Sequence, residues 1–179
     1  MDVLEPKYNS NIVVLYVARG LRGFGDGFAI IILPAYLFAL GFNSAVVGFI
    51  ATASLLGTAL LTLGIGLIGP RYDLRNLLLA GAALMTATGL AFPNVENLIL
   101  IGLIAFVGTI NPSTGDLGVL VPIEHAMLAQ GAADTDRTKT FARYSLIGAL
   151  SMATGSLAAA APDLLGSVGI DRMAAFRLM

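Results

Sequence analysis

The chain consists of long apolar runs that alternate with short polar turns. A helix needs about 20 mostly apolar residues to cross the hydrocarbon core of a bilayer. The runs predict five membrane-spanning helices, over residues 12–40, 45–68, 77–92, 98–120 and 141–161. We expect the fourth helix to extend towards Gln130. The predicted fold class is therefore an all-α membrane protein.

The turns between the apolar runs are short, at residues 41–44, 93–97 and 131–139. Short connections imply antiparallel neighbours in a compact helical bundle. Asp134, Thr135 and Asp136 are candidate N-caps for the fifth helix, because their side-chain oxygens can accept hydrogen bonds from free backbone N–H groups.

Small residues recur at four-residue spacing in the fifth predicted helix, at Ser151, Gly155 and Ala159. Such a stripe lets two helix backbones approach closely inside a membrane. We interpret this stripe as a helix-packing surface, with a substrate-lining role as the alternative.

The two ends of the chain differ in character. Residues 1–11 are predicted to form a cytoplasmic tail, and residues 12–179 to form the membrane bundle. After Pro162 a polar turn leads to residues 173–179, which have the pattern of a sixth helix at its beginning. We therefore expect five complete spanning helices and the start of a sixth, as in a fragment or a truncated gene product.

Basic residues predict how the bundle is oriented. Lys and Arg are retained on the cytoplasmic side of a membrane, and the glycine-led turn at residues 66–75 is doubly basic. An N-terminus in the cytoplasm places one large set of basic residues there and leaves Arg172 alone on the other side. That set is Lys7, Arg71, Arg75, Arg137, Lys139 and Arg143. The expected location is the bacterial inner (plasma) membrane.

Composition supports membrane insertion independently. Hydrophobic residues make up 57% of the chain and charged residues 12%, with a mean hydropathy of +0.86. Soluble domains have about 25% charged residues. The net charge of −1 gives no indication of nucleic-acid binding, and the absence of cysteine excludes disulfides and thiolate metal sites. The first apolar run is too long and too charged for a cleaved signal sequence.

Three ionisable residues interrupt the first predicted helix, at Arg19, Arg22 and Asp26. At 100° per residue they fall within an arc of roughly 60°. Arg22 and Asp26 are four residues apart and can pair. Charges inside a membrane usually face a cavity or a partner. One interpretation is a polar stripe that lines a substrate or ion pathway, with Asp26 as a proton or cation site; the other is an intrahelical pair that holds the end of the helix.

The fourth predicted helix is broken by Pro112, which removes a backbone hydrogen bond and kinks a helix. The freed carbonyl and the neighbouring polar side chains can coordinate a polar group of a substrate. Those side chains belong to Asn111, Ser113 and Thr114. A kink that serves only helix packing or rocking is the alternative.

Glu124 and His125 follow this helix, and we expect them to lie beyond the hydrocarbon. A single histidine with one carboxylate is a poor metal site. We expect Glu124 to pair with a basic residue of the cytoplasmic side, at Arg71, Arg75 or Arg143. No nucleophile, metalloprotease or phosphate-loop motif is present, so we expect neither an enzyme nor a metal or cofactor.

The turn at 66–75 resembles the signature between spans 2 and 3 of the major facilitator superfamily. Gly66, Arg71 and Arg75 match it, whereas Pro70 and Asp73 stand where the family usually has an aspartate and a second glycine. A second partial match follows the fourth helix, at Gly115, Gly118, Pro122, Glu124 and Arg137. The fourth helix has Asn111 where many proton-coupled members have an arginine, and the fifth lacks the Gly-Pro pair of drug antiporters.

The resemblance implies the N-terminal half of a twelve-span transporter with a cytoplasmic gating network. The residues assigned to that network are Gly66, Arg71, Asp73, Arg75, Asp116, Glu124, Arg137 and Arg143. The resemblance also implies alternating access about a site at the membrane midplane. For that site we select Arg22, Asp26, Asn111, Ser113 and Thr114, with proton coupling through Asp26 as a hypothesis.

The expected function is thus secondary active transport of a small solute. The expected partners are the lipid bilayer, a small-molecule substrate, and a C-terminal six-helix half or a second half-transporter, without nucleic acid. The alternative is a truncated or split membrane module that does not transport and that assembles with a partner half. A membrane-embedded enzyme is a third and weaker alternative.

Overall fold

A computed structural model describes residues 10–91, 95, 97–108 and 120–160. Every regular element in these residues is helical. The elements are α1 (Ser10–Ala39), α2 (Ser44–Ile68), α3 (Leu74–Ala91), α4 (Leu98–Val107), α5 (Val121–Gly131) and α6 (Arg137–Ala158), with short 3₁₀ turns at Gly69–Arg71 and Asp134–Asp136. The all-α fold class is confirmed for this part of the chain.

Three of these helices are long and apolar enough to cross a membrane. They are Ile12–Ala39 within α1, Ser44–Ile68 and Leu74–Ala91, and α4 is a shorter apolar helix. The predicted count of five spanning helices remains a prediction. The predicted break at Asn111, Ser113 and Thr114, together with Asp116, lies outside the described residues.

Helix ends follow from short polar residues. The Asn43 side chain accepts a hydrogen bond from the Val46 N–H at 3.0 Å and so caps α2. Asn97 caps α4 in the same way, with 2.9 Å to the Ile99 N–H. Gly41 adopts a φ of 87°, which lets the chain reverse between α1 and α2.

The predicted caps of the last helix are corrected by the structure. Asp136 stands at the N-cap of α6 without a side-chain capping bond. The helix begins at Arg137, four residues before the apolar run at 141–161, because an exposed turn of helix does not need apolar residues. Arg137 and Lys139 pair instead with Asp134 and Asp136 at 3.3 and 3.5 Å, all on the surface.

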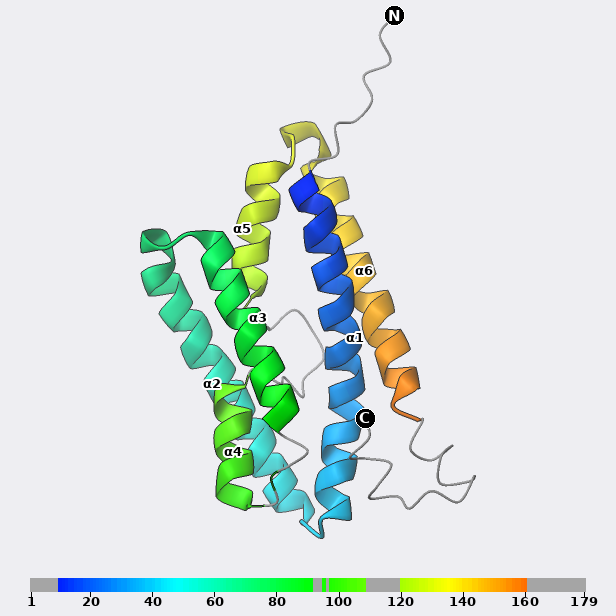
Figure 1. The fold of residues 1–179 in the computed structure, drawn as a ribbon. Helices are drawn as coiled ribbons and strands as arrows, with labels where there is room; N and C mark the ends of the chain where they lie inside the picture. Colours follow the sequence, from blue (N-terminus) through cyan, green and yellow to red (C-terminus); the bar gives the residue numbers. More distant parts are fainter. Residues whose placement is uncertain (1–9, 92–94, 96, 109–119, 161–179) are drawn as a thin grey trace, which may run out of the picture.

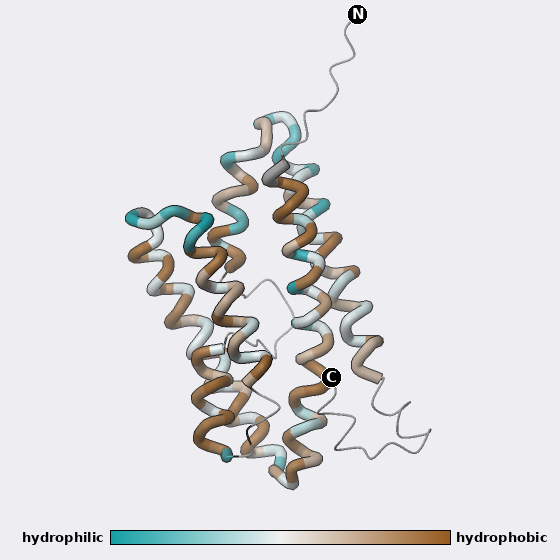
Figure 2. Tube along the Cα trace, viewed as in Figure 1, coloured by the Kyte–Doolittle hydropathy of each residue, from teal (hydrophilic) through white to brown (hydrophobic). Residues whose placement is uncertain are grey.

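One end of the bundle gathers the start of α1, the turn from α2 to α3 and the turn from α5 to α6 (Figure 1). We call this the basic end, because Arg71, Arg75, Arg137 and Lys139 lie in or next to those segments. Figure 2 shows hydrophilic colours concentrated at these turns and hydrophobic colours along the helices below them. Four of the basic residues predicted to share one side therefore lie at one end of the described bundle, and the orientation of that end towards the cytoplasm stays a prediction.

α1 and α6 run parallel and share a more extensive contact than any other pair of the described helices (Figure 1). A Cβ added at Gly155 would overlap the backbone oxygen of Phe24, and one added at Gly27 would overlap that of Met152. The Ser156 hydroxyl donates to the Gly27 oxygen at 2.9 Å. We call this contact the glycine seam. The stripe predicted from Ser151 and Gly155 therefore lies against α1.

Two apolar clusters close the bundle at its two ends. The distal cluster lies away from the basic end and joins Leu33, Tyr36 and Leu37 of α1 to Ile50 of α2 and to Ile101 and Ala105 of α4. The proximal cluster lies nearer the basic end and joins Ile12, Leu15 and Tyr16 of α1 to Leu128 of α5 and Tyr144 of α6. The candidate site lies beside the proximal cluster.

Candidate functional site

A buried ion pair joins α1 to α5. Arg22 donates from Nη1 and Nη2 to the two carboxylate oxygens of Glu124, at 2.7 and 2.6 Å. The two side chains are only 8% and 3% exposed. This fork-to-fork geometry is the strongest form of an arginine–carboxylate contact. Glu124 lies in the first turn of α5, where the helix dipole also favours a negative charge.

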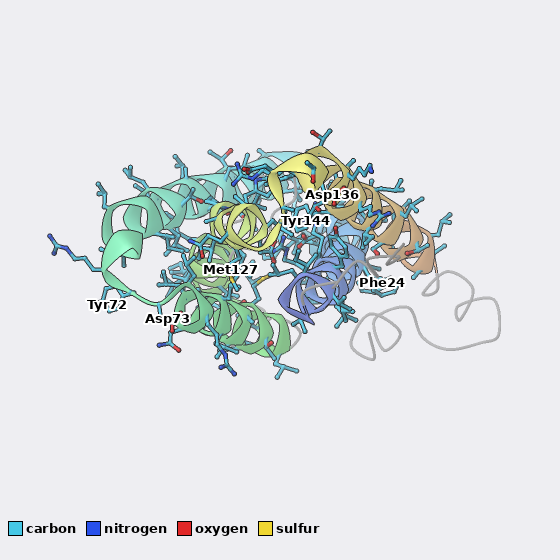
Figure 3. All side chains as sticks on the ribbon, turned by 90° about the horizontal axis from the view of Figure 1, so that it is seen from above. Phe24, Tyr72, Asp73, Met127, Asp136 and Tyr144 are labelled. Carbon is cyan, nitrogen blue, oxygen red and sulfur yellow. The ribbon has the colours of Figure 1, made fainter. Side chains whose placement is uncertain are left out.

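Tyr144 of α6 connects to both members of the pair. Its hydroxyl donates to Oε2 of Glu124 and accepts a hydrogen bond from Nη2 of Arg22 at 3.2 Å. Figure 3, which looks down the bundle, shows Tyr144 in the region where α1, α5 and α6 meet. Three helices are therefore held by one set of hydrogen bonds. We refer to Arg19, Arg22, Glu124 and Tyr144 together as the charge cluster.

Arg19 is the fourth member of the charge cluster. Its guanidinium carbon lies 5.1 Å from the centroid of the Tyr144 ring, a cation–π distance. Arg19 is 4% exposed, and a Cβ added at Gly148 would overlap its guanidinium. The missing side chain at Gly148 thus gives this cation its place against α6. His125 covers another edge of the Tyr144 ring, with centroids 5.3 Å apart.

The charge cluster lies well inside an apolar helix. Arg22 stands ten residues after Ile12, where the apolar part of α1 begins, which is about 15 Å at 1.5 Å per residue. The hydrocarbon core of a bilayer is about 30 Å thick. Buried charges are tolerated when they pair, and here both carboxylate oxygens of Glu124 accept hydrogen bonds from Arg22, whereas the Nε of Arg22 has no hydrogen-bond partner among the described residues.

The pairing differs from the one predicted from sequence. We expected Arg22 to pair with Asp26, and Glu124 to pair with Arg71, Arg75 or Arg143; Arg22 and Glu124 pair with each other instead. Glu124 is 2% exposed, so it is not a surface residue of the cytoplasmic side. The physical reason is that α5 runs back towards the start of α1 (Figure 1), and its first turn, which carries Glu124, is bonded to Arg22.

The other predicted network residues do not join the charge cluster. Gly66, Arg71, Arg75 and Arg143 are exposed. Asp73 is exposed and accepts the Arg75 backbone N–H at 3.0 Å at the start of α3. Arg137, also assigned to that network, pairs with Asp134 on the surface.

Asp26 lies one turn beyond Arg22 on α1 and is partly buried. Sequence reasoning placed Arg19 on the polar stripe but missed Tyr144 and its contact with the Arg19 guanidinium. A signal for Tyr144 exists in the sequence: with Gly148, Ser151 and Gly155 it repeats at intervals of four, three and four, so it shares the face of the small-residue stripe. Among the described residues, no group of three or more metal-ligating side chains comes together.

Comparison with known proteins gives one informative likeness. The chain is 27% identical over 147 residues to the protein of Saccharomyces cerevisiae called "Uncharacterized membrane protein YJR124C". The match covers 82% of this chain and 33% of that protein, so the chain spans about a third of its relative's length. No family model matches the chain. No solved structure matches it either. The apolar helices and this likeness together indicate a membrane location.

Proposed function

We propose that this chain forms the N-terminal part of a secondary active transporter that moves a small solute by alternating access. The observation that carries the proposal is the Arg22–Glu124 ion pair with Tyr144, buried between three helices at membrane depth. Ionisable groups inside a membrane are costly, and they commonly lie on substrate or ion pathways.

The proposed architecture is that of a major facilitator half. In it α4 and α5 are two segments of one span, which gives five spans with α6, and the N-terminus and the basic end face the cytoplasm. A C-terminal six-helix half or a second half-transporter completes the pathway. The length of the yeast relative supports a protein with a second half. The matched region covers 33% of that relative, so two thirds of the relative's length is left for further spans. It is a eukaryotic protein and gives no support for a bacterial inner membrane.

The proposed pathway residues on this half are Arg22 and Asp26, together with Asn111, Ser113 and Thr114. Asp26 is the proposed proton site, because it is a carboxylate one helical turn from a buried arginine that is already paired with Glu124. A proton on Asp26 changes the charge beside Arg22 without disturbing the hydrogen bonds of the pair.

The test is proton movement in liposomes that contain the complete protein and a pH-sensitive dye in the lumen. Organic cations, organic anions and sugars are added one class at a time. We expect one class to move protons, Arg22→Met to abolish that movement, and Asp26→Asn to remove its dependence on pH. Lys139→Gln is the control, because Lys139 forms only an exposed pair with Asp136.

Two results would count against the proposal. If no class moves protons or accumulates across the membrane, the alternative of a non-transporting module that assembles with a partner half is favoured. If Asp26→Asn transports normally and keeps its pH dependence, transport stands and proton coupling through Asp26 fails.

A further inference from the structure

The helices of the bundle are joined by contacts of different kinds. At the glycine seam the backbones of α1 and α6 touch, at Gly155 against Phe24 and at Gly27 against Met152. The distal cluster is apolar and fully packed, with Ile101 and Ala105 at 0% exposure. Close packing of this kind resists gradual deformation. We therefore treat the α1–α6 pair as one rigid unit and the distal cluster as a fixed joint.

At the basic end, α5 is the bridge between that rigid unit and α3. On the α3 side, Leu120 reaches the backbone at Gly81, where a Cβ would overlap it, and Leu78 packs against the proximal cluster. On the other side, α5 meets α1 and α6 through Leu128 and the charge cluster. Figure 1 shows α5 between α3 and the α1–α6 pair at this end.

The ion pair is the part of this bridge in which the arginine has a second carboxylate nearby in the sequence. Arg22 has a carboxylate on each of two helices within reach: Glu124 on α5, to which it is bonded, and Asp26 four residues further along α1. Positions four apart on one helix face each other and form ion pairs. If α5 moves away with Glu124, Arg22 can stay paired inside the bundle by turning to Asp26.

We propose that Arg22 exchanges its carboxylate partner between Glu124 and Asp26, and that this exchange releases and recaptures α5 at the basic end. The exchange supplies a moving part for transport and to that extent rests on the proposed function. Tyr144 is the positioning residue, because its hydroxyl touches both Arg22 and Glu124 only when α5 is held. Both arrangements keep the buried guanidinium paired with a carboxylate, which is what breaking a buried ion pair from one side would forfeit.

The experiment measures distances between spin labels in the complete protein in lipid nanodiscs, without any substrate. Residues 1–179 contain no cysteine, so within them the introduced cysteines are the only labelling sites, and cysteines elsewhere in the complete protein are first replaced by serine. Pro122→Cys on α5 with Leu21→Cys on α1 reports release, because both positions are exposed at the level of the cluster. Leu21→Cys with Leu146→Cys on α6 reports the rigid unit and serves as the distance control.

The two carboxylates have opposite expected effects. Glu124→Gln removes the α5 partner and shifts the population towards the long Pro122–Leu21 distance, by about tenfold or more. Asp26→Asn removes the alternative partner and shifts it towards the short distance. Tyr144→Phe is a milder change and also shifts the population towards the long Pro122–Leu21 distance, as Glu124→Gln does. The Leu21–Leu146 distance stays constant in all three variants.

Shifts of opposite sign in the two carboxylate variants support the exchange, whether or not any solute is transported. Equal shifts, no shifts, or a change in the Leu21–Leu146 distance overturn it, even if transport is found. If Glu124→Gln does not fold, Tyr144→Phe and Asp26→Asn give the same opposed comparison. Transport failure with opposed shifts would refute the proposed function and leave the exchange standing.

Discussion

Removing the positive charge of the buried ion pair tests the central feature of the structure. Arg22→Met keeps most of the length of the side chain but leaves the Glu124 carboxylate, 3% exposed, with only the Tyr144 hydroxyl. Two charge-assisted hydrogen bonds to Glu124, at 2.7 and 2.6 Å, are lost together with a longer one to the Tyr144 hydroxyl at 3.2 Å. Each bond to Glu124 is worth about 1.5–3 kcal/mol. Breaking a buried pair from one side costs about 3–5 kcal/mol, which agrees with that sum.

The matched control is an ion pair that the solvent reaches. Lys139 and Asp136 lie 3.5 Å apart with side chains 73% and 58% exposed. Such pairs contribute about 0–1 kcal/mol, so Lys139→Met should leave the free energy of unfolding nearly unchanged. The assay is unfolding in mixed micelles by titration with a denaturing detergent, followed by circular dichroism at the helix band.

The double variant separates the ion pair from the packing of its side chains. Arg22→Met with Glu124→Leu removes both charges, and replacing both members of a buried pair with apolar residues is often neutral. We expect the double variant to recover most of the stability lost in Arg22→Met. A coupling energy below about 1 kcal/mol, the size seen for ordinary hydrogen bonds between membrane helices, would refute the buried pair.

Three further predictions use the same unfolding assay or the absence of cysteine. Gly155→Ala places a Cβ against the backbone of α1 and should cost about 1–3 kcal/mol, whereas Gly25→Ala, with open space around it, should not destabilise the protein. Asn43→Ala removes a capping hydrogen bond and should lower the free energy of unfolding by about 1 kcal/mol. Asp136→Ala removes no such bond and should not lower it by that amount. Tyr72→Cys, exposed in the turn between α2 and α3, should react with a membrane-impermeant maleimide from the cytoplasmic side; reaction only from the other side would reverse the proposed orientation.

The helices themselves could be predicted because their signal is local. The length of an apolar run and the polar residue at its start largely decide where a membrane helix lies, as at Asn43 and Asn97. Boundaries shifted where a helix continues beyond its apolar part. α6 begins at Arg137 because exposed polar residues continue a helix as well as apolar ones do.

The partner of Arg22 could not be predicted because its signal is not local. Within its own helix the only acid at a pairing distance is Asp26, so a sequence argument selects that residue. Glu124 is 102 positions away, and its approach depends on the path of α5 along α1. The burial of Glu124 was missed for the same reason. A charged residue near the end of an apolar run is expected on the surface, and only the packing of a neighbouring helix shows that it is buried.

The glycine seam and the charge cluster depend on the same face of α6. Tyr144, Gly148 and Gly155 lie along that face; Gly155 lets the backbones touch, Gly148 makes room for the Arg19 guanidinium, and Tyr144 bonds the ion pair. The stripe at Ser151, Gly155 and Ala159 was interpreted as a packing surface with a substrate-lining role as the alternative, and packing accounts for Gly155. At Gly148 the absence of a side chain has a second consequence, because it allows a cation to lie against the helix backbone beneath an aromatic ring. Close packing of α1 on α6 is therefore what brings the two buried arginines to Tyr144, and the chemistry of the site follows from the packing of the seam.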